Sequence, residues 1–441
     1  MTLVSSFATL LQELSPVLTS PSFDTFFTLM TGWVFARRRT VTRMIEAADA
    51  VGQKHHSSFH RLFAAAAWSR DELGLAVFRL ILPWANHAGV VFLTVDDTLA
   101  RKRGLKVHGA GMHYDPLISS RRKALTSWGH SWVVLAVCLR FPFLPKTYFS
   151  LPILFRLYIS KQTLEKKKLD PKTYRTRSEL AVEITTWLCG ASPDVRFHLI
   201  GDSAYGGKSV LTALPLNCDL TSKMDLQARL YDLPPSRQPS QKGRTRKRGA
   251  RRPTPKQMLA QSRGRRVTLN LYGRQDRVRI VDTVAHAHHA PARPLRVVAV
   301  EAITGQRPTQ AFFSTRHDAS AEDVLTWYSS RWSIEVMNHD SKGHLGFEEP
   351  QGWTPQAVER TAPTAMLLYS LIVLWFAQRG HRLYRPLRRP WYTTKQHASF
   401  ADMLATLRDA SLRQFLSETP ARKRGSRKVQ RLLIITAKLA A

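Results

Sequence analysis

The residues GVVFLTVDDT at positions 89–98 are an apolar run that ends in two acids, and this pattern predicts a buried strand. The residues VRFHLIGDSAYGG at 195–207 repeat it, because an apolar run stops at Asp202 and a glycine-rich turn follows. Two further runs predict strands and one amphipathic segment predicts a helix, at 131–141, 147–159 and 175–190 respectively. Strands interspersed with a helix indicate a mixed α/β sheet.

Composition narrows the class of protein. The chain has 441 residues, which suggests roughly two to four domains, and 44% of them are hydrophobic, so most of the chain should fold. Lysine and arginine number 66 against 32 acids, giving a net charge of +34. An enzyme for small molecules does not need this excess, whereas a partner made of phosphates does. A ribosome-like or membrane-surface protein is the alternative that charge alone leaves open.

The cysteines and apolar segments predict a soluble intracellular protein. Cys138, Cys189 and Cys218 have no CxxC spacing, so they indicate neither a zinc site nor a disulfide framework, and they suit a reducing cytoplasm. The first residues lack the basic and apolar regions of a signal peptide. The apolar run at 366–377 is too short to span a bilayer and predicts a buried helix.

The pattern along the chain predicts five segments. A helical region comes first, followed by an α/β region, a β-rich stretch with four short strand-like runs, a second helical region and a basic helical tail. The expected boundaries are 1–88, 89–224, 225–316, 317–380 and 381–441.

The first helical region is a candidate for DNA binding. Residues 40–52 and 57–69 predict two helices joined by a tight turn, with Ser57 or Ser58 as the N-cap of the second. Such a pair is compatible with a helix-turn-helix motif or with a plain helical hairpin. Three basic residues are the candidate DNA contacts here: Arg38, Arg39 and Arg61.

Residues 236–266 hold twelve lysines and arginines and no acid. Such a run predicts a mobile arm or loop, which either follows phosphates or is merely solvated. The candidate phosphate contacts within it are Arg246, Lys247, Arg248, Arg251 and Arg252.

The residues YSSRWSIEVMNHDSK at 328–342 combine four functional groups. Tyr328, Arg331, Glu335 and Lys342 fall within roughly 60° of one another on a helix. The simplest alternative is an ordinary surface ion pair between Arg331 and Glu335.

Three acids occupy positions that together predict a metal site. Asp96 and Asp202 each end an apolar run, and they would leave the same sheet edge if the two strands were parallel neighbours. A helix crossing that edge could bring Glu335 to them. Oxygen ligands without histidine or cysteine suit Mg²⁺ or Mn²⁺, and two such ions can drive phosphodiester chemistry. Each acid alone has a plainer explanation, as a turn former or an ion-pair partner.

The spacing Tyr-x2-Arg-x3-Glu-x6-Lys at 328–342 resembles the signature of DDE transposases from bacterial insertion sequences. It is similar to the cut-and-paste branch, whose ribonuclease-H-like domain is interrupted by a β-strand insertion. VDDT at 95–98 and GDSAYG at 201–206 also resemble that family's two aspartate motifs. The resemblance covers roughly residues 90–375 and implies a ribonuclease-H-like mixed sheet with a β-rich insertion.

The resemblance implies roles for individual residues. Asp96, Asp202 and Glu335 would be the catalytic and metal-binding triad for two Mg²⁺ or Mn²⁺ ions, with Asp97 as the alternative to Asp96. The phosphate contacts near the cleaved end would be Tyr328, Arg331 and Lys342.

The chain departs from that family in one respect. Some relatives hold a flipped base with a tryptophan of the insertion, but no tryptophan lies between Trp187 and Trp327 here. Tyr272, Phe312 or Phe313 would have to stack instead.

The resulting hypothesis is a DNA transposase that acts as a homodimer in the bacterial cytoplasm, associated with the nucleoid. Its partners would be the terminal inverted repeats of its element and target DNA, both double-stranded. Two alternatives remain: a metal-dependent nuclease without strand transfer, and a descendant that binds DNA without catalysis.

Overall fold

The computed structural model describes residues 2–85, 89–120, 122–234, 246–303, 307–386, 395 and 397–419. Their strands form one twelve-stranded mixed sheet in the order β2-β3-β1-β5-β6-β12-β11-β10-β7-β8, with β4 paired to β3 and β9 paired to β10. The strands are β1 (Val90–Arg101), β2 (Gly111–Tyr114), β3 (Thr126–Phe141), β4 (Leu144–Tyr158), β5 (Arg196–Gly201), β6 (Cys218–Met224), β7 (Leu230–Tyr231), β8 (Arg251–Arg252), β9 (Arg265–Leu271), β10 (Arg274–Ala287), β11 (Ala290–Ala302) and β12 (Gln310–Ser314).

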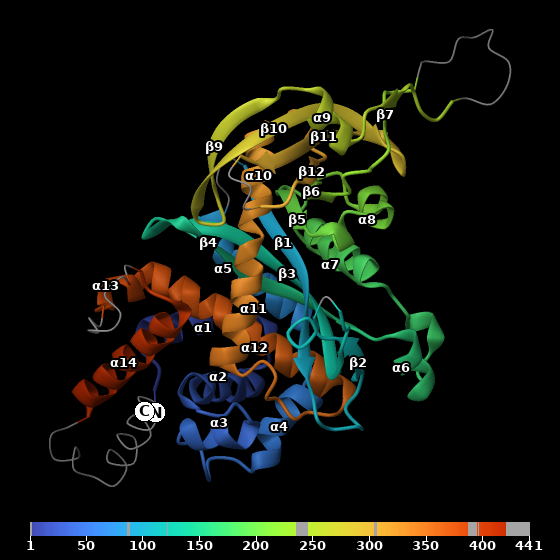
Figure 1. The fold of residues 1–441 in the computed structure, drawn as a ribbon. Coiled ribbons are helices and arrows are strands. Elements are labelled where there is room, and N and C mark those ends of the chain that lie inside the picture. Colours follow the sequence, from blue (N-terminus) through green and yellow to red (C-terminus); the bar gives the residue numbers. More distant parts are fainter. Residues whose placement is uncertain are drawn as a thin grey trace.

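Helices cover this sheet and gather at one end of it (Figure 1). They are α1 (Ser5–Gln12), α2 (Ser20–Phe35), α3 (Val41–Ala47), α4 (His56–Ala64), α5 (Arg70–Ala85), α6 (Lys161–Lys166), α7 (Arg177–Ala191), α8 (Lys208–Ala213), α9 (Pro255–Gln261), α10 (Ala321–Ser330), α11 (Trp332–Leu345), α12 (Pro355–Trp375), α13 (His381–Leu383) and α14 (Phe400–Glu418). Single turns are η1 (Ser15–Val17), η2 (Pro171–Thr173), η3 (Ser203–Tyr205) and the π-helical η4 (Phe376–Gly380).

The three central strands of the sheet run parallel to one another. This is the arrangement that the predicted metal site needs in order to bring Asp96 and Asp202 together. β1 runs parallel to β5 with Thr94 opposite Ile200, and β5 runs parallel to β6. Asp96 and Asp202 each follow that paired position by two residues, so both lie just beyond the carboxyl end of the β1–β5 pairing. The expectation that the first strand ends at the two acids is wrong, because β1 continues to Arg101 in antiparallel pairing with β3, and Asp96 therefore lies inside the strand. The predicted strands at 89–98 and 195–207 and the predicted helix at 175–190 are otherwise confirmed, as β1, β5 and α7.

The β-rich stretch continues the same sheet. The four expected runs are β9, β10, β11 and β12, and β12 pairs antiparallel with β6. We call β7–β12 with α9 the β extension; it lies at the opposite end of the molecule from α2, α3 and α4 (Figure 1). β6 itself was not predicted, because CDLTSKM mixes polar and apolar residues without a clear run.

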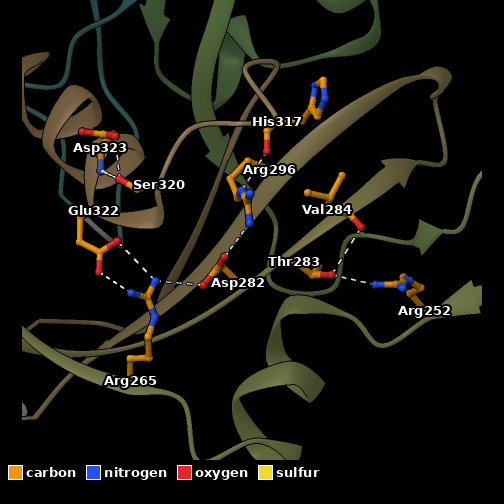
Figure 2. Close-up of polar contacts among 10 residues, drawn as sticks. All are labelled: Arg252, Arg265, Asp282, Thr283, Val284, Arg296, His317, Ser320, Glu322 and Asp323. Atoms are coloured by element: carbon orange, nitrogen blue, oxygen red, sulfur yellow. Dashed lines mark hydrogen bonds and ion pairs between the residues drawn. The ribbon is translucent and has the colours of Figure 1, made fainter.

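Ion pairs fasten the β extension to α10 (Figure 2). Arg265 on β9 pairs with Glu322 on α10 at 2.7 Å and with Asp282 on β10 at 3.3 Å. Arg296 on β11 pairs with the same Asp282 at 2.8 Å and donates to the carbonyl oxygen of His317. The start of α10 is thus fixed relative to three strands.

Residues 2–85, the described part of the first segment, do not form a core of their own. Their apolar side chains belong to one hydrophobic cluster that also contains the central strands and α12. Phe7 packs edge-on against Trp375, and the Trp33 indole donates to the carbonyl oxygen of Leu345 at 2.8 Å. The predicted boundary near residue 88 is thus crossed by a continuous core, with α5 packed on β3 and β4.

The predicted helix at 366–377 is part of a longer one. The stretch Pro355–Leu383 is long and apolar enough to cross a membrane by length and composition alone, but 94% of its apolar window is buried inside the protein. Its packing against β4, α5 and α4 makes it the central helix of the core.

The prediction of one mobile arm at 236–266 is wrong for its second half. β8 pairs with β7, and Thr254 and Gln257 form a capping box that starts α9. Residues 236–245 of that arm lie outside the described residues, as do residues 420–441 of the expected helical tail.

Candidate active site

β1 places two neighbouring acids on opposite faces of the sheet. Asp96 faces α11, where its Oδ2 accepts a hydrogen bond from the Arg331 guanidinium at 3.3 Å. Asp97 faces the other way, toward Arg177 of α7 at 3.2 Å and the Tyr205 hydroxyl at 3.3 Å. Side chains alternate along a strand, so only one of the two can share a site with α11. The geometry supports Asp96 over Asp97.

The turn after β5 holds Asp202 at the same edge. Asp202 caps η3 by accepting from the backbone N–H of Ala204 at 2.9 Å, and its carbonyl oxygen accepts from the Ser222 hydroxyl at 2.6 Å. Gly206 is required here, since a Cβ on it would lie 2.4 Å from the Ser222 hydroxyl. The glycine-rich motif therefore folds back onto β6 and holds Asp202 where its charge raises the pKa of both Asp96 and Asp97.

The four-residue motif at 328–342 spans two helices instead of one. α10 ends at Ser330 and α11 begins at Trp332, and the backbone N–H of Ile334 donates to the Arg331 carbonyl three residues earlier. Arg331 keeps helical dihedral angles, so α11 still follows the direction of α10 (Figure 1). Across this tightened turn Arg331 reaches Glu335 with a hydrogen bond of 2.5 Å and lies 5.8 Å from the centre of the Tyr328 ring.

The Arg331 guanidinium lies between two of the candidate triad acids. It donates to Asp96 at 3.3 Å and to Glu335 at 2.5 Å, and its side chain is only 14% exposed. Among the described residues, no three histidine, cysteine or acidic side chains are gathered into a metal-binding group. The donor set nevertheless fits a hard divalent cation: all three candidate ligands are carboxylates, and a cationic group already occupies the space between two of them.

More than half of the chain matches a known protein family. The family model described as DDE superfamily endonuclease matches residues 30–281, which is more than half of the chain. The chain belongs to the DDE superfamily endonucleases. No match is found among curated proteins. The matched range contains Asp96 and Asp202 and ends within β10, so Glu335 lies outside it. Membership implies DNA-cleaving, transposase-like activity, and enzymes of this family generally use divalent metals.

Burial makes Asp96 an unusual acid in this endonuclease. Burial, opposed by the Arg331 charge and reinforced by Asp97 and Asp202, raises the pKa of Asp96 to about 7. The ionised carboxylate of Asp96 is thus unfavourable when no cation is bound. A bound cation that replaces the proton would compensate the negative charge and so offset the free-energy cost of burying it.

This shift predicts how the stability of the metal-free endonuclease depends on pH. The folded pKa of Asp96, about 7, lies above its ordinary value of 3.8. The protonated carboxyl of Asp96 therefore makes its full contribution to the free energy of unfolding below pH 3.8. This contribution is lost as the pH rises through the folded pKa of about 7. Asp96→Asn should remove this loss, so that above the folded pKa the variant is more stable by on the order of a few kcal/mol. Thermal unfolding in a chelator across this range measures the effect, and two parallel curves would contradict it.

Tyr328 and Lys342 occupy different surroundings. Tyr328 is buried against Phe312, with ring centroids 4.4 Å apart, and the Arg331 guanidinium lies 5.8 Å from its ring centre. Lys342 is two turns beyond Glu335 on α11, or about 10 Å along the helix axis. Burial lowers its pKa, and the charge of Glu348 opposes this. Tyr328 therefore supports Arg331, and Lys342 faces the far end of β1.

Of the three aromatic residues expected to stack on a base, Tyr272 alone is accessible. Phe312 and Phe313 are buried in the sheet, whereas Tyr272 is 37% exposed at the tip of the β9–β10 hairpin. Arg307 lies 4.6 Å from the centre of its ring. Tyr272 and Tyr328 line the same pocket, so the hairpin tip lies next to the motif that carries Arg331.

The N-terminal helices match the expected pair in outline. α3 and α4 are shorter than predicted, and the cap of α4 is His55, whose ring accepts from the Ser57 backbone N–H, not Ser57 or Ser58. Arg38 and Arg61 are exposed, as DNA contact requires. The assignment of Arg39 to DNA needs correction: it is 8% exposed, and its guanidinium donates to the carbonyl oxygens of Arg37 and His344.

The basic residues of the β extension also divide into two groups. Arg246, Lys247 and Arg251 are exposed. Arg248 donates to the carbonyl oxygen of His288, and Arg252 pairs with Asp232 at 2.5 Å, so both help to hold the extension together. The first group remains available for phosphate.

Arg177 and Tyr205 were missed in the sequence. Together they fix Asp97, and Arg177 also stacks on Tyr158 with 4.2 Å to the ring centre. Tyr205 lies inside the GDSAYG motif, which was a usable signal, but Arg177 is merely the first residue of a well-capped helix.

Proposed function

We propose that this DDE endonuclease is a transposase that binds the ends of its mobile element, cleaves them and joins them to target DNA. The observation that carries the proposal is the position of Arg331, held between Asp96 of β1 and Glu335 of α11 with Asp202 at the same sheet edge. A metal-binding acid and a phosphate-binding cation then share one turn of helix. The central parallel strands crossed by a helix support a ribonuclease-H-like fold with a β-strand insertion.

The carboxylates of Asp96, Asp202 and Glu335 would hold two Mg²⁺ or Mn²⁺ ions. When bound, such ions activate a water or a 3′-hydroxyl and stabilise the leaving oxygen of a phosphodiester. Arg331 would exchange its carboxylate partners for the scissile phosphate, which its planar fork can hold at two oxygens. Arg177 and Tyr205 keep β1 in place from the other face of the sheet.

The remaining basic residues suggest a path for DNA. Lys342 extends the active site along α11, and Arg38 and Arg61 are exposed at the N-terminal helices. Arg246, Lys247 and Arg251 are exposed on and just before β8 of the β extension. We expect a homodimer in the bacterial nucleoid to bind the inverted repeats at the ends of its element. The DNA would contact both ends of this path, which agrees with the net charge of +34.

Family membership as an endonuclease leaves a second candidate, a nuclease that hydrolyses DNA without joining it. Both reactions use the same carboxylates and differ only in whether water or a 3′-hydroxyl attacks. Purified protein incubated with Mg²⁺ and the DNA flanking its gene should release fragments with 3′-hydroxyl ends and join them to a target plasmid. A chelator should abolish both products. Cleavage without joined products would favour the nuclease, and binding without cleavage would favour a non-catalytic descendant.

A further inference from the structure

Exposed apolar side chains gather around the edge strand β2. Leu105 in the β1–β2 loop is 76% exposed, and Leu117 in the β2–β3 loop is 75% exposed. Met112 and Tyr114 lie between them on the open face of β2, at 49% and 57%. Ile118 and Trp353 complete the group, because the Trp353 carbonyl oxygen accepts from the backbone N–H of His108 in the same loop. Isolated exposed apolar residues are ordinary, but a contiguous group marks a contact surface.

The β2–β3 loop is held in shape with its leucine pointing outward. Asp115 is only 1% exposed, and its carboxylate accepts from Arg101, from the Ser127 hydroxyl and from the backbone N–H of Leu117. The Ser119 hydroxyl donates to the Asp115 carbonyl oxygen at 2.7 Å. A buried, fully bonded acid thus orders the turn that exposes Leu117, so this exposure does not result from a loose loop.

Positive charge surrounds these apolar side chains. Residues 101–125 contain a single acid, the buried Asp115, and seven lysines and arginines. Four of the seven are exposed and form no ion pair with an acid among the described residues: Arg103, Lys106, Arg122 and Lys123. The charge complements a polyanion.

This group is connected to the active site. Arg101 ends the strand that carries Asp96, five residues further along, which is about 17 Å of extended chain. The Arg101–Asp115 ion pair joins that end of β1 to the β2–β3 loop, and Lys342 of α11 faces both residues. At 3.4 Å of rise per base pair, the same distance corresponds to about five base pairs of duplex.

We propose that this group, called the β2 surface, binds duplex DNA beginning about five base pairs from the scissile phosphate. The β2 surface rests on the proposed function, since it presumes DNA at the active site. Its lysines and arginines neutralise phosphates on either side of a groove, and its apolar side chains enter the groove between them, as apolar wedges do in proteins that deform the minor groove. It would hold the DNA that leaves the active site along β1.

A second copy of the chain is the less suitable occupant. A two-fold contact places the same patch on both partners, so the exposed lysines and arginines would face their own copies without acids to balance them. The seven-to-one excess of basic residues in 101–125 therefore favours DNA.

A cross-linking experiment tests the proposal in the full chain. Cys138, Cys189 and Cys218 are buried, so Leu117→Cys provides an accessible thiol for a photoactivatable reagent. The matched control is Leu216→Cys, another exposed leucine, which lies before β6 at the opposite edge from Asp202. With duplex carrying the DNA that flanks the gene, Leu117→Cys should cross-link to DNA and Leu216→Cys should not. Cross-linking from position 117 to a second copy of the chain, or to nothing, would overturn the proposal.

A salt titration provides the second measurement. Replacing Arg103, Lys106, Arg122 and Lys123 with glutamine should reduce the slope of log affinity against log salt by about 3–4. Lys146→Gln is the control, since it lies beyond the β3–β4 turn, about 40 Å along β3 from β2, and should reduce the slope by less than 1. An unchanged slope in the fourfold variant would refute the β2 surface while leaving the proposed function standing. A parent protein that binds no DNA would refute the proposed function itself.

Discussion

Replacing Asp96, Asp202 or Glu335 with the corresponding amide should abolish DNA strand cleavage and leave DNA binding nearly intact. Each amide keeps the size of the side chain but removes the negative charge that a divalent cation needs. Losing several kcal/mol of transition-state stabilisation lowers the rate on the order of a thousandfold or more. Gel assays of cleavage and of binding, run on the same preparations with Mg²⁺, measure the two effects separately.

Asp97→Asn is the matched control, because it changes the adjacent residue on the other face of β1. Its partners are Arg177 and Tyr205, so the loss should appear as about 1–3 kcal/mol of stability and only a modest loss of rate. Wild-type cleavage by Asp202→Asn or Glu335→Gln would refute the assignment of the triad. An inactive Asp97→Asn beside an active Asp96→Asn would show that the neighbouring acid is the ligand.

Arg331→Ala should slow cleavage of bound DNA by roughly ten- to a hundredfold, which corresponds to the loss of about 1.5–3 kcal/mol in one charge-assisted contact. The substitution removes the cation between Asp96 and Glu335 and with it the proposed phosphate contact. Arg331→Lys should retain more activity than Arg331→Ala and less than wild type, because an ammonium keeps the charge but cannot hold a phosphate at two places.

The alternative is that Arg331 only forms an ion pair with Glu335 on the helix surface, worth about 0.3–0.5 kcal/mol. The 14% exposure of the Arg331 side chain and its second bond to Asp96 argue against this. Comparing cleavage of pre-bound DNA with the thermal unfolding temperature of each variant separates the two readings. Full activity in Arg331→Ala would leave Arg331 as an ion-pair partner alone.

The sequence alone predicted the parts of the site that depend on local pattern. The apolar runs before Asp96 and Asp202 were sufficient to place two strands, and the parallel pairing of β1 with β5 brought the acids to one edge. Alternation along β1 showed that Asp96 and Asp97 must face apart, but not which of them faces α11. That choice depends on how α7 and α11 pack on the sheet, and these are contacts between residues more than 70 positions apart along the chain.

Long-range contacts also explain the errors. Arg39 was expected at DNA because it follows two other arginines, but Glu349 and His344, about 300 positions away, bury it. The charge of residues 236–266 concealed the capping box Thr254–Gln257, which is a local signal and could have predicted α9. The continuous core across residue 88 was not predictable from the change in composition there.

Arg265 pairs with Glu322 and Asp282, and Arg296 pairs with Asp282; this network affects which changes in chain length the enzyme would tolerate. Asp202 and Glu335 are 133 positions apart, yet the intervening chain returns to the same sheet through β12 and enters α10 already anchored by those pairs. Evolution can therefore lengthen or shorten the loops of the β extension freely, provided that the hairpins keep their anchorage. Family members should differ most in the length of the chain between these two acids. They should differ least at the few residues whose ion pairs anchor α10 to the β extension.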